Sequence, residues 1–323
     1  MNILVTGCAG FIGFHIVEKL IQNRRISEKI FGIDNINSYY DVDLKKNRLK
    51  ILKKNKNFIF EKIDICNFNK LENFCKKNKI KKIIHLAAQA GVRYSIDNPK
   101  TYHDNNINGF FNILEVSRIL KINHLICAST SSVYGKNNRY PTKENFITDS
   151  PKSFYAATKK CNEIMAYSYS EIYNLPITML RFFTVYGSLG RPDMSLFKFT
   201  KNILNNKKID VYNYGNHIRD FTHVYDVANC VIKIINKKTK NNPQFNILNL
   251  SGSNPQKLKY FIKLIEKKLN TKSKKNMMKM QKGDVHKSHG DNTKLLNYIG
   301  KYNFQPIERG IEEFIDWYFF YYK

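Results

Sequence analysis

The sequence predicts an α/β fold built on a doubly wound, parallel β-sheet. Short apolar runs alternate with helical patterns through the first 183 residues, which is typical of strands that are joined by crossover helices. A glycine-rich turn joins the first apolar run to the first helical pattern, and no internal repeat or low-complexity linker interrupts the alternation. With 323 residues, the chain is long enough for one large domain or two interlocked domains.

The expected strands and helices follow one another along the chain. The runs that predict strands are short and rich in Ile, Val, Leu and Phe, and between them apolar residues recur at helical spacing. We expect strands at residues 2–6, 30–34, 58–65, 82–88, 124–129 and 177–183, and helices at residues 12–23, 44–54, 69–77, 100–120 and 154–173.

The regular alternation ends near Thr184, where loop-rich segments begin to alternate with helices. We therefore expect a larger N-terminal domain at residues 1–183 and a smaller domain, formed mainly by residues 184–323, that closes over a ligand. Segments near 221–250 are expected to return to the first domain. The aromatic tail "FIDWYFFYYK" predicts a helix that packs on the core rather than a membrane anchor.

Composition excludes several classes of protein. No stretch of 18 or more apolar residues predicts a transmembrane helix, and "MNILVTG" does not resemble a signal peptide. The six cysteines are scattered, without metal-ligand spacing, so we expect free thiols, a cytoplasmic location and no metal site. The net charge of +28 comes from lysines spread along the whole chain, which indicates codon bias rather than a nucleic-acid or membrane surface. The charge would still attract an anionic substrate.

The stretch "TGCAGFIG" places Gly7, Gly10 and Gly13 between the first strand and the first helix. A turn without Cβ atoms lets a pyrophosphate approach the backbone N–H groups at the positive end of the helix. Asp34 ends the second strand, where a carboxylate accepts hydrogen bonds from the adenosine ribose and repels a 2′-phosphate. The next residue is Asn35 rather than Arg or Lys, so NAD is favoured over NADP.

The stretch "YAATK" places Tyr155 and Lys159 on one face of the helix expected at 154–173. A tyrosine with an ordinary pKa near 10 is a poor base, but a neighbouring ammonium group and a positive nicotinamide both favour the phenolate. Four hydroxyl side chains, Ser129 to Ser132, follow the expected fifth strand in "CASTSSVYG". Together these features indicate proton transfer at the end of the sheet.

Five stretches together resemble the extended short-chain dehydrogenase/reductase family of NAD-dependent nucleotide-sugar epimerases and dehydratases. They are "TGCAGFIG", "LAAQAGVRYS", "STSSVYG", "YAATK" and "RDFTHVYD", and the likeness covers nearly the whole chain. The stretches "DNINSYYDVDLKKNRLK", "AAQAGVRYSIDNP", "LRFFTVYG" and "GRPDMSLFKFTKNIL" are similar to the branch that interconverts UDP-glucuronate and UDP-galacturonate.

The resemblance implies a Rossmann-type first domain that binds NAD and a second domain that binds the UDP-sugar. It also implies a homodimer, formed through the helices near 100–120 and 154–173, and a role in surface polysaccharide synthesis. The cofactor residues that it implies are Gly7, Gly10, Phe11, Ile12, Gly13, Asp34, Asn35, Asn37, Ser38, Asp64, Ile65, Leu86, Ala87, Ala88, Asn105, Tyr155, Lys159 and Phe183.

In such an epimerase the sugar C4 passes a hydride to NAD⁺ while a tyrosine takes the proton of the 4-hydroxyl. The hydride then returns to the other face of the 4-keto sugar, and no net oxidation occurs. The resemblance implies that Tyr155 is the base, that Lys159 supports it and binds the cofactor ribose, and that Thr130 bridges the tyrosine and the 4-oxygen.

The substrate residues also follow from the resemblance. The sugar carboxylate is expected near Ser131, Ser132, Thr184 and Arg191, and Arg219 is expected on the diphosphate. For the uridine, Val211 and Tyr212 are expected beside uracil and Asp284 on the ribose. The position of Arg93 fits cofactor phosphate, substrate carboxylate or loop structure equally well.

The same motifs occur in enzymes with activities other than 4-epimerisation of UDP-glucuronate. A 4,6-dehydratase needs an acid and a base after the threonine, whereas this chain has Ser131 and Ser132 there. A UDP-glucose/UDP-galactose 4-epimerase and a UDP-glucuronate decarboxylase stay open as alternatives. In a non-catalytic NAD-binding or nucleic-acid-binding protein we would expect one or more of Thr130, Tyr155 and Lys159 to be replaced. All three residues are present.

Overall fold

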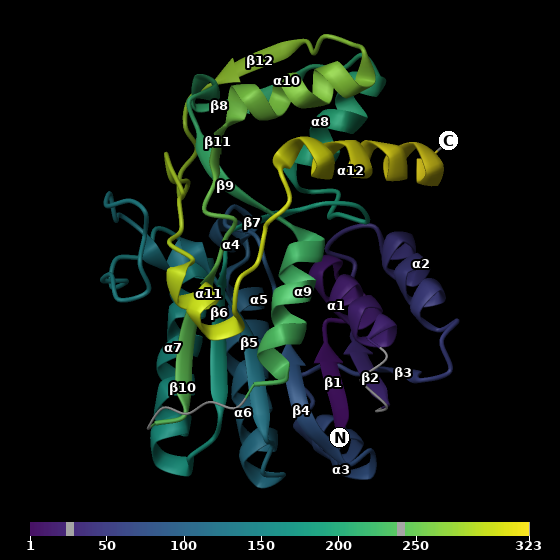
Figure 1. Cartoon of the computed structure of the whole chain (residues 1–323), viewed down its shortest axis with the longest axis vertical. Coiled ribbons are helices and arrows are strands. Elements are labelled where there is room, and N and C mark those ends of the chain that lie inside the picture. The colour runs from purple at the N-terminus through teal and green to yellow at the C-terminus, as the bar shows by residue number, and fades with distance from the viewer. Residues whose placement is uncertain (24–28, 238–242, 323) are drawn as a thin grey trace.

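A computed structural model of the chain describes residues 1–23, 29–237 and 243–322. Its centre is a seven-stranded sheet in which every pair of neighbouring strands is parallel. This sheet confirms the predicted fold class (Figure 1). Its strands, from one edge to the other, are β10 (Phe245–Leu250), β6 (Ile177–Phe182), β5 (His124–Thr130), β4 (Ile80–His85), β1 (Asn2–Thr6), β2 (Ile30–Asp34) and β3 (Phe58–Lys62).

Side chains of successive strand residues point to opposite faces of the sheet, so each face has its own core. Ile3 and Val5 of β1 belong to one apolar cluster and Leu4 to the other. The first cluster is covered by α1 (Phe11–Gln22), α2 (Val42–Leu52), α9 (Val224–Ile235) and α11 (Thr293–Ile299). The second is covered by α3 (Phe68–Lys77), α6 (Gly109–Ile119) and α7 (Phe154–Tyr173).

The elements differ from the sequence-based expectation mainly at their ends. The third strand stops at Lys62 and the fourth at His85, because residues beyond these points line a cavity instead of continuing the sheet. The helix expected at 100–120 consists of α5 (Pro99–Tyr102), a π-helical turn η1 (His103–Asn108) and α6. A short helix α4 (Tyr94–Asp97) precedes them, and a 3₁₀ turn η2 (Ser131–Tyr134) follows β5.

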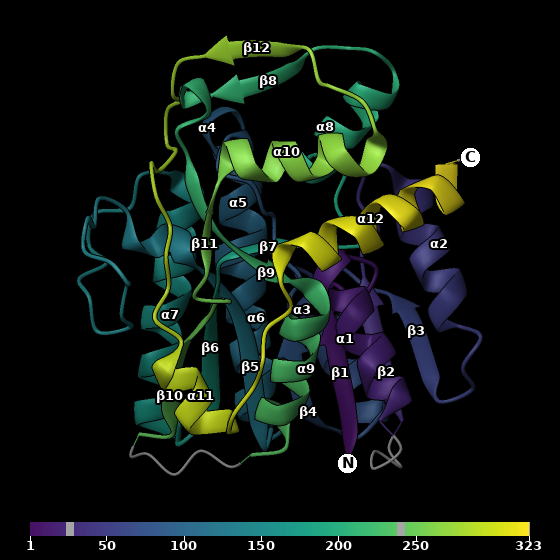
Figure 2. The ribbon, with the colours of Figure 1, turned by 45° about the horizontal axis from the view of Figure 1, so that its top comes forward.

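Residues after Thr184 build most of a smaller layer above the carboxyl ends of the sheet (Figures 1 and 2). This layer has its own apolar core, which is separate from the two cores of the large sheet. Its small sheets consist of β7 (Thr184–Tyr186), β9 (Ile218–His223) and β11 (Pro255–Lys257), and of β8 (Ile209–Tyr212) and β12 (Lys275–Met278). The helices are α8 (Ser195–Leu204), α10 (Leu258–Leu269) and α12 (Ile307–Tyr322), and a 3₁₀ turn η3 (Asn213–Gly215) follows β8.

The aromatic tail forms helix α12, as predicted, and buries Phe314, Ile315 and Tyr318 in the core of the smaller layer. Among the described residues, no helix has the length and apolar character required to cross a membrane. All six cysteines are free thiols.

A buried ion pair joins β6 to α7. Arg181 donates two hydrogen bonds to the Glu163 carboxylate, at 2.9 Å and 2.8 Å, and both side chains are only 2% exposed. Ser129 in β5 donates a third hydrogen bond to Glu163, at 2.6 Å. Because parallel N–H···O bonds fix the relative orientation of the two groups, this pair sets the position of α7 against the sheet.

We expect replacement of Glu163 by Leu to lower the free energy of unfolding by about 3–5 kcal/mol, because Arg181 would remain as an unpaired buried charge. The double variant Glu163→Leu/Arg181→Met removes both charges and is expected to regain most of that loss. Urea unfolding of the wild type, the single variant and the double variant measures both effects. Equal losses in the two variants would contradict the assignment of the cost to an unpaired charge.

Candidate active site

A cavity of about 840 Å³ lies between the carboxyl ends of the strands and the smaller layer. Ligands of doubly wound sheets bind at this edge, where the strand order reverses between β1 and β4. The cavity brings together most of the residues that the sequence predicted: Gly7, Gly10, Phe11, Ile12, Gly13, Asp34, Asn35, Asn37, Ile65, Leu86, Ala87, Ala88, Arg93, Asn105, Thr130, Ser131, Ser132, Tyr155, Lys159, Phe183, Thr184, Arg191, Tyr212, Arg219 and Asp284.

Three predicted residues do not line this cavity. Ser38 is exposed in the turn after β2. Asp64 accepts hydrogen bonds from the Asn35 side chain, at 2.9 Å, and from the backbone of Cys66, so it supports a lining residue. Val211 is buried in the core of the smaller layer, because alternation along β8 turns Tyr212 toward the cavity and Val211 away from it.

The glycine turn after β1 has the shape that a phosphate cradle needs. Gly7 has φ +70°, and a Cβ atom there would lie 2.8 Å from the backbone nitrogen of Ala87. A Cβ atom on Gly13 would collide with the carbonyl oxygen of Gly7. Helix α1 starts without a side-chain cap and without an acidic residue in its first turn, so its first N–H groups remain available to an anion.

Asp34 stands at the end of β2 and holds the turn. Its carboxylate accepts hydrogen bonds from the backbone N–H groups of Ala9, at 3.1 Å, and Ile36, at 2.8 Å. Burial raises the pKa of Asp34, while these two N–H groups and the nearby Lys45 oppose the rise. Each carboxylate oxygen keeps a lone pair with which to accept a ribose hydroxyl.

Two cations of α2 that the sequence analysis did not single out, Lys45 and Arg48, support this region. The Lys45 ammonium group donates to the backbone and side-chain oxygens of Asn37, at 2.7 Å and 2.8 Å. Arg48 is fully buried and donates to the carbonyl oxygens of Ala9, at 2.9 Å, and Leu189, at 2.6 Å. Their i, i+3 spacing was the available signal, but charged residues at that spacing usually lie on a solvated helix face.

The catalytic end of the cavity is formed by β5 and α7. The Ser153 hydroxyl caps α7 by accepting from the backbone N–H of Ala156, at 3.2 Å, and Tyr155 and Lys159 follow on the cavity side. Thr130 ends β5, and its hydroxyl both accepts from the backbone N–H of Ser132 and donates to the Ser132 hydroxyl, at 3.2 Å each. The predicted trio of Thr130, Tyr155 and Lys159 therefore lines one end of one cavity.

Burial dominates the electrostatics of this end. It raises the pKa of Tyr155, whereas hydrogen bonding with Thr130 and the positive charge of Arg191 oppose the rise. Burial also lowers the pKa of Lys159 to about 8, so this side chain is still mainly protonated at pH 7. Since the protein alone raises the pKa of Tyr155, the low pKa that the sequence predicted depends on further positive charge from a ligand.

The expected substrate end contains three arginines, of which one pairs with Asp193 and two lie near Asp284. Arg191 makes a two-point ion pair with Asp193, at 3.0 Å and 2.6 Å, so its guanidinium is already engaged in the cavity wall. Arg219 pairs with Asp284 at 3.1 Å. Arg93 lies 3.8 Å from the same Asp284 carboxylate, and its guanidinium covers the ring of Tyr212.

The sequence prediction missed a wall of the cavity that helix α8 supplies. Ser195, Lys198, Phe199 and Asn202 of α8 all line the cavity. Their spacing of i, i+3, i+4 and i+7 places them on one helix face, which was the signal that could have identified them. His217, directly before β9, is another lining residue that the prediction did not include.

The chain is similar over its whole length to known proteins. CapI of Staphylococcus aureus is 46% identical over 340 residues, with all of both chains covered. A UDP-glucuronate 4-epimerase of Thermodesulfobacterium geofontis is 40% identical over 318 residues, which cover 97% of this chain and 95% of that protein. The crystal structure of UDP-glucuronic acid 4-epimerase from Bacillus cereus in complex with UDP-glucuronic acid and NAD has a TM-score of 0.93 and 30% identity, with 100% of both chains covered.

A family model matches residues 3–248, which include the glycine turn, Asp34, Thr130, Tyr155 and Lys159. The match confirms the predicted resemblance and NAD as the cofactor, and the glycine turn and Asp34 have the free donors and acceptors that NAD requires. The chain belongs to the NAD dependent epimerase/dehydratase family.

Proposed function

We propose that this chain is an isomerase that converts UDP-glucuronate to UDP-galacturonate by inverting C4 through a transient 4-keto intermediate. The observation that carries the proposal is the composition of the catalytic end of the cavity. Thr130, Tyr155 and Lys159 stand beside three further hydroxyl side chains, those of Ser131, Ser132 and Thr184. Among the described residues, no carboxylate from 129–132 or from α7 lines the cavity.

The chain's own residues handle the proton of the sugar 4-hydroxyl. Tyr155 receives it as phenolate, and Thr130 holds both the tyrosine and the 4-oxygen. To Lys159, which lines the cavity one helical turn after Tyr155, we assign the support of the phenolate and the binding of the cofactor ribose. Bound NAD⁺ would supply the hydride acceptor for C4 and a positive charge that lowers the pKa of Tyr155. Phe183 lines the cavity and would flank the nicotinamide.

The three hydroxyls explain why the substrate is a uronate and why it keeps its carboxylate. A 4-keto uronate is a β-keto acid, which loses CO₂ when the carboxylate bond aligns with the carbonyl π system. Hydrogen bonds from Ser131, Ser132 and Thr184 hold the carboxylate out of that alignment. A dehydratase would need an acid and a base at Ser131 and Ser132, which serine does not provide.

The cavity divides between the two parts of the chain. We assign residues 1–183, with segments near 221–250, to NAD binding, and residues 184–323 mainly to the UDP-sugar. This division is supported by the position of β10 in the large sheet and of Tyr212, Arg219 and Asp284 in the smaller layer. Arg219 suits the diphosphate, Asp284 the ribose and Tyr212 the uracil ring.

The cellular setting is also part of the proposal. The enzyme acts in the cytoplasm, where free thiols such as the six of this chain persist, and its product serves surface polysaccharide synthesis. Lysine-rich surfaces attract the anionic UDP-sugar, in line with the net charge of +28.

Incubation of the purified protein with UDP-glucuronate, without added NAD, is expected to yield UDP-galacturonate, detected by chromatography. The variant Tyr155→Phe keeps the ring but removes the base, so its kcat is expected to fall by about 10²–10⁴-fold. Epimerisation of UDP-galactose in place of the uronate would instead assign a neutral-sugar epimerase. Release of CO₂ and a UDP-pentose would assign a decarboxylase, and full turnover by Tyr155→Phe would contradict the role of this residue.

We further propose a homodimer formed through α6 and α7. Both helices expose apolar side chains, among them Phe111 at 46%, Ile164 at 59% and Ile172 at 64%. Light scattering is expected to give a mass near twice 38.0 kDa, and Ile164→Asp/Ile172→Asp is expected to give monomers. The matched control is Ile147→Asp, in the loop after η2, where a side chain is 80% exposed but lies outside these helices. A monomeric wild type would contradict this interface.

A further inference from the structure

His217 is a buried histidine whose ring nitrogens make no hydrogen bond of good geometry with the residues that the structure describes. It stands directly before β9, where its carbonyl oxygen accepts from the backbone N–H of Leu258 at 2.8 Å. The side chain is only 5% exposed and lines the cavity. Neither ring nitrogen makes a hydrogen bond of normal geometry with the described residues. Since buried polar groups are almost always hydrogen-bonded, this imidazole lacks a partner that a ligand would supply.

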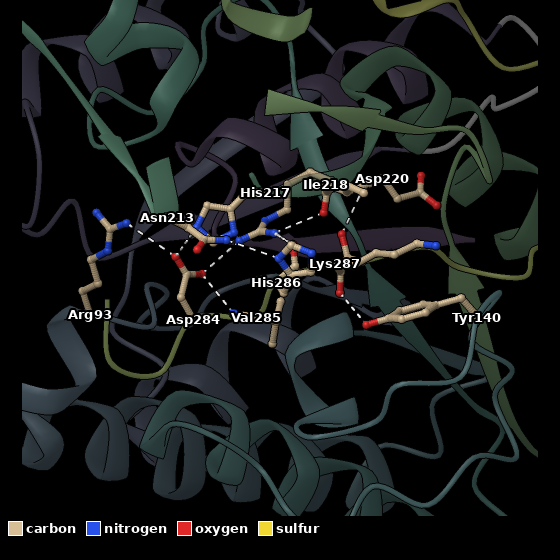
Figure 3. A network of polar contacts seen from close by, with 12 residues as sticks. Arg93, Tyr140, Asn213, His217, Ile218, Asp220, Asp284, Val285, His286 and Lys287 are labelled. Carbon is tan, nitrogen blue, oxygen red and sulfur yellow. Dashed lines mark hydrogen bonds and ion pairs between the residues drawn. The ribbon is translucent and has the colours of Figure 1, made fainter. Parts of the chain in front are cut away.

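The surroundings of His217 define what kind of ligand group it faces (Figure 3). Its Nε2 atom lies 3.6 Å from Oδ2 of Asp284, which is too long for a hydrogen bond but close enough for both to touch one small group. Arg219 holds the other oxygen of Asp284 at 3.1 Å, and Arg93 lies 3.8 Å from Oδ2. His217 and Asp284 therefore flank a position that two arginines border.

The charge state of His217 narrows the choice of ligand group. Burial and the positive charge of Arg219 lower the pKa of His217, and the Asp284 carboxylate and the backbone of His286 and Val285 oppose that effect only in part. At neutral pH the ring is uncharged and offers one N–H donor and one nitrogen acceptor. A hydroxyl group also donates and accepts, whereas a phosphate only accepts and is better served by a charged donor such as Arg219.

The position of His217, two residues before Arg219, indicates that the hydroxyl group it contacts belongs to the ribose. His217 and Arg219 both reach Asp284, so their side chains lie on the same side of the strand. In a nucleotide the ribose adjoins the phosphate directly, so a phosphate on Arg219 places the ribose within reach of His217.

We propose that His217 forms the ribose subsite together with Asp284, and that it makes the enzyme favour a nucleotide with an intact ribose diol over one that lacks the hydroxyl bound by His217. One ring nitrogen of His217 bonds to a hydroxyl of the ribose diol, and the Asp284 carboxylate accepts from the same diol. The inference rests on the UDP moiety of the proposed substrate and is independent of which sugar the UDP carries.

The test is titration calorimetry of the NAD-loaded protein with UDP, 2′-deoxy-UDP and 3′-deoxy-UDP. His217→Phe keeps a flat aromatic ring but removes both nitrogens, so UDP is expected to bind about tenfold more weakly. The loss is expected to vanish for the deoxynucleotide that lacks the hydroxyl bound by His217. His217→Gln restores a donor and an acceptor and is expected to recover part of the affinity.

His286→Phe is the matched control, because that exposed ring comes from the same loop as Asp284 but contacts Asn213, at 3.2 Å. It is expected to bind all three nucleotides like the wild type. Equal weakening of all three nucleotides by His217→Phe, or no weakening of UDP, would overturn the proposal. The outcome does not depend on the epimerase assay, because a protein that binds UDP in this way but does not form UDP-galacturonate would refute only the proposed function.

Discussion

The buried pair of Arg181 and Glu163 fixes the catalytic helix against the sheet, and the geometry of the cavity depends on that placement. Glu163 lies one turn after Lys159 on α7, and its carboxylate also accepts from Ser129, the residue before Thr130. One carboxylate thus links the strand that carries Thr130 to the helix that carries Tyr155 and Lys159. Because both charges are removed from water, the pair is stable only while its hydrogen bonds are complete, so the arrangement tolerates little displacement.

The glycine turn is the second constraint, and it acts from the opposite side of the cavity. Close contacts with Ala87 exclude any side chain at Gly7, and α2 secures the same turn through the hydrogen bond from Arg48 to Ala9. In the proposed complex the cofactor would rest on backbone groups of this turn, while the sugar would be surrounded by hydroxyl groups that can rotate. Such a combination suits a reaction in which the cofactor stays in place while the 4-keto sugar rotates and presents its other face to the hydride.

The sequence sufficed to predict features that depend on local pattern. Apolar runs gave the six expected strands, and the spacing of Gly7, Gly10 and Gly13 gave the phosphate turn. Residues brought to the cavity by tertiary packing were missed. Arg48 and Lys45 have the spacing of an exposed helix face, yet both are buried because α2 packs over the turn. No sequence motif includes His217. Its role becomes apparent only from its contact with Asp284, which lies 67 residues later in the chain.

In the proposed reaction a hydride leaves C4 of the sugar and returns to the same carbon without exchange with water. UDP-glucuronate that carries deuterium at C4 tests this step, by mass spectrometry and NMR of the uronates at equilibrium in ordinary water. UDP-galacturonate is expected to retain the deuterium at C4 in full. Loss of the label to solvent would contradict it, because the inversion would then proceed by proton exchange at carbon rather than by hydride transfer inside a closed site.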